Sequence, residues 1–289
     1  MNRIPRFAGG SFFCEMRHFL IILLAGTLAC GSPTPPTPAA RAATIETRDD
    51  LRGPYDSALV QGSFVLHDIG RDHWILIDSI QADVATLPAS TYKVLGSLIA
   101  LEDKVVADEN TLMPWDSVYR RQEVDRDLNL RDALKYSAYW FHRDVARRIG
   151  ADRLKHWWDT VGYGNADTTD GFDKAWVAGN LRITPRQQVE FLERLYRNDL
   201  PFSQRSMDIV KSIMVQEDTL GYVLRGKTGW ATPEGGDIAW FVGWFEKADS
   251  TGPYFFANRI RCSDTTNMAF GPARRSTAID LLHALEVLP

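Results

Sequence analysis

Apolar residues follow two periods along most of the chain, and each period predicts one kind of element. Runs rich in β-branched and aromatic residues predict strands at 62–68, 74–79, 222–224, 238–246 and 254–261. Apolar residues spaced three or four apart predict helices at 91–101, 130–148, 151–161, 185–196, 203–214 and 276–285. Strands towards both ends with helices between them indicate an α+β fold, in which helices flank an antiparallel sheet and also form a helical subdomain. A functional site is expected where the sheet and the subdomain meet.

The first 43 residues do not share this pattern. A basic start at Met16, a short apolar stretch and a small residue before Cys30 have the form of a secretory signal, too short to span a membrane. We assign 1–30 to this signal, with Met16 as an alternative start. Residues 31–43 are rich in proline and form an extended tether, which leaves 44–289 as the folded domain.

The position of Cys30 suggests a lipoprotein signal, because the residues before it resemble a lipobox and the cysteine would be acylated. Thr27 stands where a leucine is usual, so ordinary cleavage nearby is the alternative. Either reading predicts export, as a periplasmic protein or a cell-envelope lipoprotein. The only membrane contact expected is the lipid anchor.

The composition of the chain limits the classes of partner that we expect. The 289 residues are 45% hydrophobic and 24% charged, with a net charge of −4, which is ordinary for a globular domain with a large core. A nucleic-acid partner would require a basic face and is not expected. Of three cysteines, Cys14 is removed with the signal and Cys262 stands alone as a small packed residue. The six histidines lack ligand spacing, so no metal is expected.

Candidate chemistry begins at Pro88-Ala89-Ser90-Thr91-Tyr92-Lys93. If Ser90 opens a helix, Lys93 lies on the same face and its amine reaches the serine oxygen. A serine hydroxyl needs an adjacent base to become a nucleophile, and lysine is a base only as the neutral amine. The apolar residues that follow predict the burial that lowers a lysine pKa. The alternative is a helix start with a solvated lysine.

A second motif, Lys227-Thr228-Gly229-Trp230, lies about 135 residues downstream among predicted strands. On a strand, Lys227 and Thr228 present a cation and a hydroxyl to a substrate carboxylate, and Gly229 allows close approach of the backbone. An exposed strand end with a turn glycine is the alternative for this motif alone. Ser-x-x-Lys early and Lys-Thr-Gly late is the order found in serine β-lactamases and penicillin-binding proteins.

Together with these two motifs, the chain from about Gly62 to the C-terminus resembles the class D serine β-lactamases. Further segments carry the resemblance, in the family's order: Gly62–Asp68, Tyr136-Ser137-Ala138, Tyr163-Gly164-Asn165 on a surface turn, Lys174–Pro185, and Pro272–Ser276 at the start of the C-terminal helix. The resemblance implies the fold of that family and hydrolysis of β-lactam antibiotics, small-molecule substrates, through a serine acyl-enzyme.

The resemblance also implies roles. Ser90 would be acylated, and Lys93 would be the general base as a carbamate (N6-carboxylysine) formed from carbon dioxide or bicarbonate, with no other cofactor. Trp176 would donate its indole N–H to that carbamate. Ser137 would relay a proton to the lactam nitrogen.

The remaining roles concern binding. Lys227, Thr228 and Arg274 would hold the substrate carboxylate, and Gly229 belongs to the same motif. Trp230 and Tyr139 are also expected among the substrate-binding residues. The backbone N–H groups of Ser90 and Trp230 would form an oxyanion hole.

One position departs from the family pattern, because Tyr139 stands where the family has a valine beside the carbamate. Tyr139 could crowd that pocket or donate a hydrogen bond into it, or its ring could turn aside. Slow deacylation would make the protein a penicillin-binding or sensor-like protein. A peptidoglycan D,D-peptidase is a further alternative, against which stand the Trp176 loop and the compact size.

Overall fold

A computed structural model describes residues 43–249 and 252–288. The predicted signal at 1–30, including Cys30 and Met16, lies outside these residues, as does nearly all of the tether at 31–43. Within the described residues, seven strands form one sheet in the order β1-β3-β2-β7-β6-β5-β4. The strands are β1 (Thr44–Thr47), β2 (Gln61–Asp68), β3 (His73–Ile77), β4 (Val215–Asp218), β5 (Tyr222–Ala231), β6 (Asp237–Lys247) and β7 (Tyr254–Cys262).

The sheet is antiparallel except for the edge strand β1, which pairs in parallel with β3. The helices are η1 (Asp49–Leu51), α1 (Gly53–Ser57), α2 (Ser79–Ala82), η2 (Ala89–Tyr92), α3 (Lys93–Glu102), α4 (Leu130–Lys135), α5 (Tyr139–Ile149), α6 (Ala151–Val161), α7 (Ala175–Ala178), α8 (Pro185–Tyr196), α9 (Gln204–Ile213) and α10 (Phe270–Ala284). The predicted α+β class, with helices flanking a largely antiparallel sheet, is confirmed.

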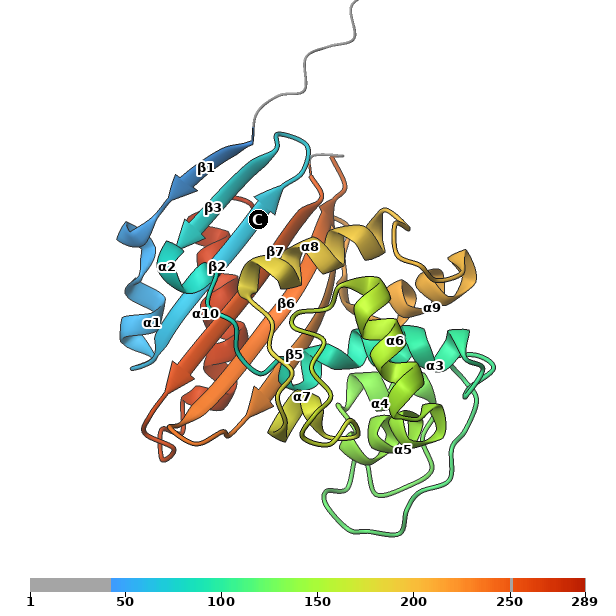
Figure 1. The fold of residues 1–289 in the computed structure, drawn as a ribbon. Coiled ribbons are helices and arrows are strands. Elements are labelled where there is room, and N and C mark those ends of the chain that lie inside the picture. Colours follow the sequence, from blue (N-terminus) through green and yellow to red (C-terminus); the bar gives the residue numbers. More distant parts are fainter. Residues whose placement is uncertain (1–42, 250–251, 289) are drawn as a thin grey trace, which may run out of the picture. The chain divides into compact units, whose positions relative to one another are not determined.

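Helices cover both faces of the sheet (Figure 1). The C-terminal helix α10 packs on β6 and β7 from one side, while α8 crosses β2, β6 and β7 on the other. Helices α3 to α6 and α9 form the helical subdomain, which lies beside the end of the sheet that contains β5. One apolar core therefore lies between the sheet and α10, and a larger one joins the sheet, α8 and the subdomain.

Local sequence explains where α8 begins and ends. Thr184 and Gln187 form a reciprocal capping box, and Pro185 occupies the first turn, where its missing N–H costs no hydrogen bond. The buried residues of α8 recur at helical spacing and face the sheet. The predicted range 185–196 agrees with the structure.

Other predicted elements need correction. The expected single helix at 130–148 is two helices, α4 and α5, because the chain turns at Tyr136-Ser137-Ala138, where Ser137 has a left-handed φ of 55°. The helix expected from 276 begins six residues earlier, at Phe270. The sequence analysis also missed β1, β4, α1, α2 and α7, which are all five residues or shorter.

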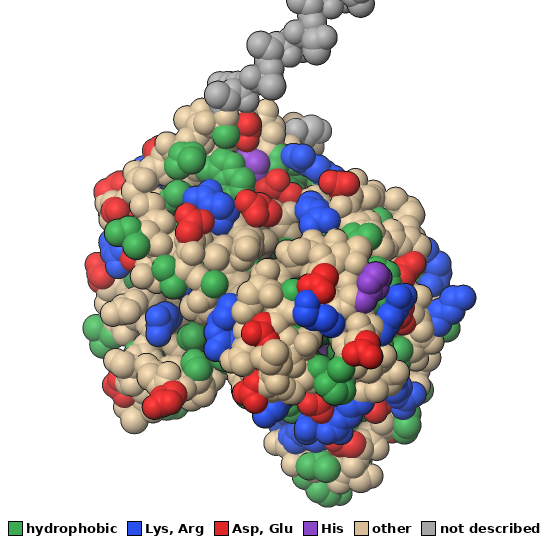
Figure 2. Space-filling view, viewed as in Figure 1, with side chains coloured by type: hydrophobic (Ala, Val, Ile, Leu, Met, Phe, Trp, Pro, Cys, Tyr) green, Lys and Arg blue, Asp and Glu red, His purple; other side chains and the backbone are tan. Residues whose placement is uncertain are grey.

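No helix within the described part of the chain is both long and apolar enough to cross a membrane. The space-filling surface is indented at its lower edge, between the part built on the sheet and the helical subdomain (Figure 2). Lys and Arg side chains gather on the lower part of the subdomain, over α4 and α5.

Candidate active site

Ser90 lies in the 3-10 turn η2, directly before α3. A 3-10 helix has three residues per turn, so positions i and i+3 eclipse, and Ser90 and Lys93 share one face. Ala89, immediately before the serine, has a left-handed φ of 51°. Ser90 lines a pocket of about 410 Å³ at the junction of the sheet and the subdomain.

Lys93 is 1% exposed, as the apolar residues after it predicted. Burial is the main cause that holds its pKa well below the ordinary value, and the nearby cations Lys227 and Arg121 lower it further. The Lys93 amine donates a 2.5 Å hydrogen bond to the carbonyl oxygen of Ser137. The lowered pKa of Lys93 favours the neutral amine, which is the form that a general base requires.

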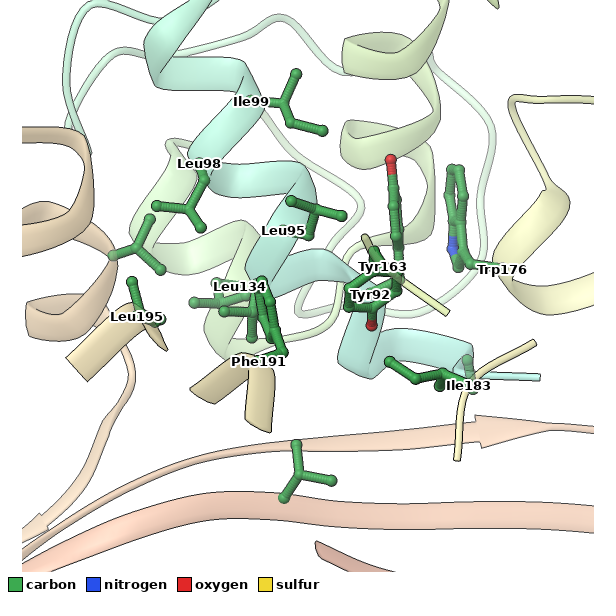
Figure 3. Close-up of a cluster of buried hydrophobic side chains, with 14 of the residues drawn as sticks. Tyr92, Leu95, Leu98, Ile99, Leu134, Tyr163, Trp176, Ile183, Phe191 and Leu195 are labelled. Atoms are coloured by element: carbon green, nitrogen blue, oxygen red, sulfur yellow. The ribbon is translucent and has the colours of Figure 1, made fainter. Parts of the chain in front are cut away.

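Apolar side chains surround this turn (Figure 3). Leu95, Leu98 and Ile99 of α3 pack with residues of α4, α7 and α8, so the helix that begins at Lys93 is embedded in the larger core. Desolvation of the Lys93 amine is therefore a property of this packing and is not caused by a single neighbour.

Ser137 lies at the break between α4 and α5. Its hydroxyl oxygen accepts a hydrogen bond from the Lys227 amine, and its carbonyl accepts from Lys93. The break is closed by backbone hydrogen bonds, from the Ser137 N–H to Leu134 and from the Ala138 N–H to Ala133. The turn thus directs both polar groups of Ser137 towards the two lysines.

The Lys-Thr-Gly motif lies inside β5, beside η2. Lys227 is buried, and burial together with the charges of Arg274 and Arg121 lowers its pKa to about 7. A Cβ atom on Gly229 would lie 3.1 Å from the carbonyl oxygen of Pro88 and 3.2 Å from the amide nitrogen of Ser90. A side chain at this position would therefore push the backbone of η2 away by a few tenths of an ångström, and glycine allows β5 to lie this close to Ser90.

Trp230 and Arg274 close the same side of the pocket. Trp230 is 45% exposed, and its ring meets Phe270 edge to face with centroids 5.4 Å apart. The guanidinium of Arg274, in α10, lies 5.6 Å from the Trp230 ring centroid. Burial lowers the Arg274 pKa. Ser90, Ser137, Thr228, Gly229, Trp230 and Arg274, all predicted from the sequence, line this one pocket.

Trp176 lies in the short helix α7, which packs on η2. Its ring is fully buried and stacks on Tyr92, the neighbour of Lys93, with centroids 4.6 Å apart (Figure 3). Its indole nitrogen has no hydrogen-bond partner within the described residues. The indole nitrogens of Trp115, Trp158 and Trp244 are likewise without a partner among these residues, but Trp176 lies in the helix that packs on the Ser90 turn. A buried N–H without a partner is costly, so the Trp176 indole is available as a donor to a further group beside this turn.

Tyr139 is the first residue of α5 and is half-buried. Its ring centroid lies 6.2 Å from that of Trp176, and the Arg143 guanidinium lies 5.9 Å from the tyrosine ring. Tyr139 does not line the Ser90 pocket. It therefore neighbours the unpaired indole and not the surface on which Ser90 opens.

Two further features differ from the sequence analysis. Tyr163, expected on a surface turn, is 1% exposed and packs edge to face on Phe191, because the turn is covered by α8. The pocket is also lined by Arg121, Glu123, Lys135 and Tyr136, none of which was predicted as a site residue. Arg121 and Glu123 belong to a polar stretch without periodicity, which gave no signal.

No group of three or more His, Cys, Asp or Glu side chains among residues 43–249 and 252–288 could hold a metal ion. Cys262 is free and partly buried at the end of β7. Neither feature adds chemistry to the pocket.

Known proteins are similar to this chain in sequence and in structure. Residues 79–278 match the family model described as the penicillin binding protein transpeptidase domain. The probable beta-lactamase YbxI of Bacillus subtilis is 40% identical over 205 residues, which cover 71% of this chain and 76% of that protein.

Solved structures agree with the sequence matches. The class D beta-lactamase from Sebaldella termitidis is 33% identical, with a TM-score of 0.81 over 86% of this chain and 100% of that one. The C-terminal domain of the Bacillus licheniformis BlaR penicillin-receptor is 30% identical, with a TM-score of 0.79 over 86% of this chain and all of that domain. With the residues of the Ser90 pocket in place, the chain belongs to the class D β-lactamases, within the penicillin-binding protein transpeptidase family.

Proposed function

We propose that this protein hydrolyses β-lactams through an acyl-enzyme on Ser90. The observation that carries the proposal is the position of Ser90 one turn before a buried Lys93 whose pKa is strongly lowered. Ser90 opens on a pocket that Arg274 also lines, and the buried Lys227 donates a hydrogen bond to Ser137 of the same pocket. Only a neutral lysine, or the base formed from it, can accept the serine proton near neutral pH.

The steps follow from the positions of the groups. The Ser90 oxygen would bond to the lactam carbonyl carbon while its proton passes to the base at Lys93. Collapse of the tetrahedral intermediate would break the carbon–nitrogen bond, and Ser137 would pass a proton to the departing nitrogen. Water would then cleave the Ser90 ester and release the ring-opened acid.

Binding groups surround the reacting atoms. Lys227, Thr228 and Arg274 would hold the substrate carboxylate, since a buried cation gains most from an anionic partner. The amide N–H groups of Ser90 and Trp230 would stabilise the oxyanion, each contributing about 3 kcal/mol. Gly229 would serve by allowing β5 to approach the Ser90 turn.

We further propose that Lys93 works as a carbamate. Carbon dioxide adds only to a neutral amine, and the product is an anionic base that needs a hydrogen-bond donor in a largely apolar site. Both conditions are supported here, by the lowered pKa of Lys93 and by the unpaired indole N–H of Trp176. Bicarbonate is accordingly the only added factor that activity should require.

A sensor-like protein that stays acylated is the second candidate. Tyr139 beside Trp176 favours it, because the larger side chain could slow the water that cleaves the ester. The relative regulatory protein BlaR1 of Bacillus licheniformis is 32% identical over 243 residues, but this chain covers only 39% of that protein. A D,D-peptidase acting on peptidoglycan is a third candidate, supported by no observation specific to it.

One experiment separates the β-lactamase from the two candidates that would stay acylated. Residues 44–289 are mixed with benzylpenicillin, with and without bicarbonate, and intact mass is followed over time beside the Ser90→Ala variant. We expect an adduct on Ser90 that forms and clears while penicilloate accumulates. A persistent adduct would instead identify a protein that stays acylated, either a sensor or a D,D-peptidase, and the absence of any adduct would contradict the acyl-enzyme mechanism.

Lys93→Ala provides the companion test. We expect turnover to be lost, because the variant removes the proposed base, whereas Lys155→Ala, which removes an exposed lysine of α6, should leave the rate unchanged. Turnover is followed by loss of β-lactam absorbance. An unchanged rate in Lys93→Ala would remove Lys93 as the base.

We also propose that the protein is exported and held at the cell envelope by a lipid on Cys30. The support is the signal-like pattern of 1–30 and the proline-rich tether after it. Its partners would be β-lactams and, through the anchor, a membrane surface.

A further inference from the structure

Besides Arg274, two further cations line the Ser90 pocket. They are Arg121 and Lys135, on the wall that faces β5. Thr228, Trp230 and Arg274 come from β5 and α10, whereas Arg121, Glu123 and Lys135 come from the subdomain and its loop. The Arg121 guanidinium donates a hydrogen bond to the carbonyl oxygen of Tyr136, the residue before Ser137. Arg121 is thus placed at the pocket by the same turn that positions Ser137.

The loop that carries Arg121 is well anchored. It begins and ends at a backbone bridge between Met113 and Leu128. The Trp115 N–H donates to Asp127 over 2.8 Å, and the buried Trp140 indole donates to the Val124 carbonyl over 2.8 Å. These contacts hold the loop against α5, so Arg121 keeps its place at the pocket without a contact from a substrate.

Among the described residues, no acid forms an ion pair with Arg121. Its neighbour Arg120 forms an ion pair with Asp116 at 2.6 Å, but Arg121 has no carboxylate partner among the described residues. Guanidinium has five N–H donors, and Arg121 uses one of them for the Tyr136 carbonyl. The field of Arg121 reaches the site, because it contributes to the lowered pKa values of Lys93 and Lys227.

The charges that line this wall favour an anion. Lys135 points over the ring of Tyr136, 5.2 Å from its centroid, and also lacks a carboxylate partner among the described residues. Glu123 is the one acid among the residues that line the pocket. Arg121, Lys135 and Arg274 give the lining three positive charges, and Glu123 gives it one negative charge. The buried Lys227 of β5 adds a further cation when it is protonated.

We propose that Arg121, supported by Lys135, binds a second anionic group of the substrate, on the acyl side chain and not on the ring carboxylate. The inference rests on the proposed acylation of Ser90 and names a substrate class for it: β-lactams whose acyl side chain carries a carboxylate. Lys227, Thr228 and Arg274 would be occupied by the ring carboxylate, which leaves Arg121 for the other end of the ligand. Arg121 is in this sense a specificity residue and not a catalytic one.

The test compares two penicillins that differ by one carboxylate, benzylpenicillin and its α-carboxy derivative, carbenicillin. The readout is the ratio of their acylation rate constants, measured in competition by intact mass on the full domain. Acylation is followed instead of turnover so that slow deacylation does not obscure the result. A change that acts only through the Lys93 pKa alters both rates and leaves the ratio unchanged.

We expect Arg121→Gln to lower the carbenicillin-to-benzylpenicillin ratio about two- to fivefold, the effect of one exposed charge pair. Arg121→Lys should keep most of the ratio, since it keeps the charge. Glu123→Gln should raise the ratio about twofold because it removes the opposing charge. Arg126→Gln is the matched control, since Arg126 is paired with Asp132 and does not line the pocket.

An equal ratio in the native protein and in Arg121→Gln would overturn the proposal, even with benzylpenicillin acylation intact. Equal losses in Arg121→Gln and Arg121→Lys would also contradict it, since the lost factor would then be shape and not charge. If neither penicillin acylates the native protein, the proposed function itself fails.

Discussion

At the scale of single residues, the site depends on charged groups that have been removed from water. Lys93 and Lys227 are both buried, each within reach of Ser137, and each in the field of Arg121. Burial disfavours the ammonium form, so both amines lose protons more readily than exposed lysines do. This desolvation favours the neutral form of Lys93, which the proposed role as a base requires, and it makes Lys227 sensitive to pH near neutrality.

The unpaired indole of Trp176 leads to the first prediction at this scale. Trp176→Phe keeps the ring that stacks on Tyr92 but removes the N–H, so a carbamate on Lys93 would lose its donor. A lost hydrogen bond to a charged group costs about 1.5–3 kcal/mol, which corresponds to a deacylation rate lower by roughly 10- to 100-fold. Single-turnover kinetics measure this rate.

Added bicarbonate should partly restore the Trp176→Phe rate, since a weaker carbamate forms again at higher carbon dioxide concentration. The ¹³C NMR signal of labelled carbamate provides an independent readout. A variant with native rate and native carbamate signal would show that Trp176 contributes packing alone.

Lys227 gives a prediction about pH. Its pKa in the folded protein is about 7, below the ordinary value of 10.5, so its ammonium form dominates only below about pH 7. A penicillin carboxylate binds the ammonium form better, and kcat/KM should therefore fall as pH rises through this value. Lys227→Arg, which stays charged, should move that fall to higher pH.

The lowered pKa of Lys227 also predicts how the free energy of unfolding changes with pH. Between about pH 7 and 10.5 the unfolded chain binds a proton on Lys227 that the folded chain has lost, so this group makes the free energy of unfolding rise with pH. Urea titrations of the native protein and of Lys227→Met over this range measure the difference. A steeper rise in Lys227→Met than in the native protein would contradict the shift.

At the scale of elements, the site is a meeting of three backbone segments. The turn η2 presents Ser90, the break between α4 and α5 presents Ser137, and β5 passes beside both. Each segment is held by its own hydrogen bonds and by the core around α3. The reacting groups are therefore placed by backbone geometry more than by their own side-chain rotamers.

Gly229→Ala tests the close approach of β5 to η2. The new methyl group would lie 3.1 Å from the Pro88 oxygen and 3.2 Å from the Ser90 nitrogen, which forces the two segments apart. We expect acylation to fall at least tenfold while stability falls by only about 1–2 kcal/mol. Stopped-flow acylation and thermal melting measure the two effects separately.

Gly221→Ala is the matched control, because a Cβ at Gly221 would meet only the Thr219 hydroxyl, at 3.9 Å. Its acylation rate should equal that of the native protein. A native rate in Gly229→Ala as well would show that the motif glycine does not set the distance to Ser90.

At the scale of the whole molecule, the pocket lies where the sheet and the subdomain meet (Figure 1). Residues 43–288 contain the elements that build it, so we expect a chain that begins at residue 44 to keep the hydrolytic rate of the full chain. The full chain expressed in a bacterium should partition into a detergent phase through Cys30. Cys30→Ala should move it to the aqueous phase, and a full chain that is already aqueous would contradict lipidation.

The sequence by itself was sufficient to predict the class of fold and most of the pocket. The spacing of apolar residues along the chain predicted α8 and the central strands, because the buried side chains of a helix or strand recur at the period of that element. Motif residues such as Ser90 and Lys227 were recognisable because their chemistry requires those residue types at short, fixed spacing. The resemblance to a known family connected motifs that lie far apart in the chain.

Tertiary structure alone decided the features that depend on contacts between distant segments. Apolar periodicity continues from α4 into α5, so the turn at Ser137 became visible only with its contacts to Lys93 and Lys227. The unpaired indole of Trp176 and the charge of Arg121, which has no ion-pair partner among the described residues, are likewise relations between neighbours in space. A pattern along the chain records which faces are buried, whereas desolvation, pairing and pKa depend on which groups meet there.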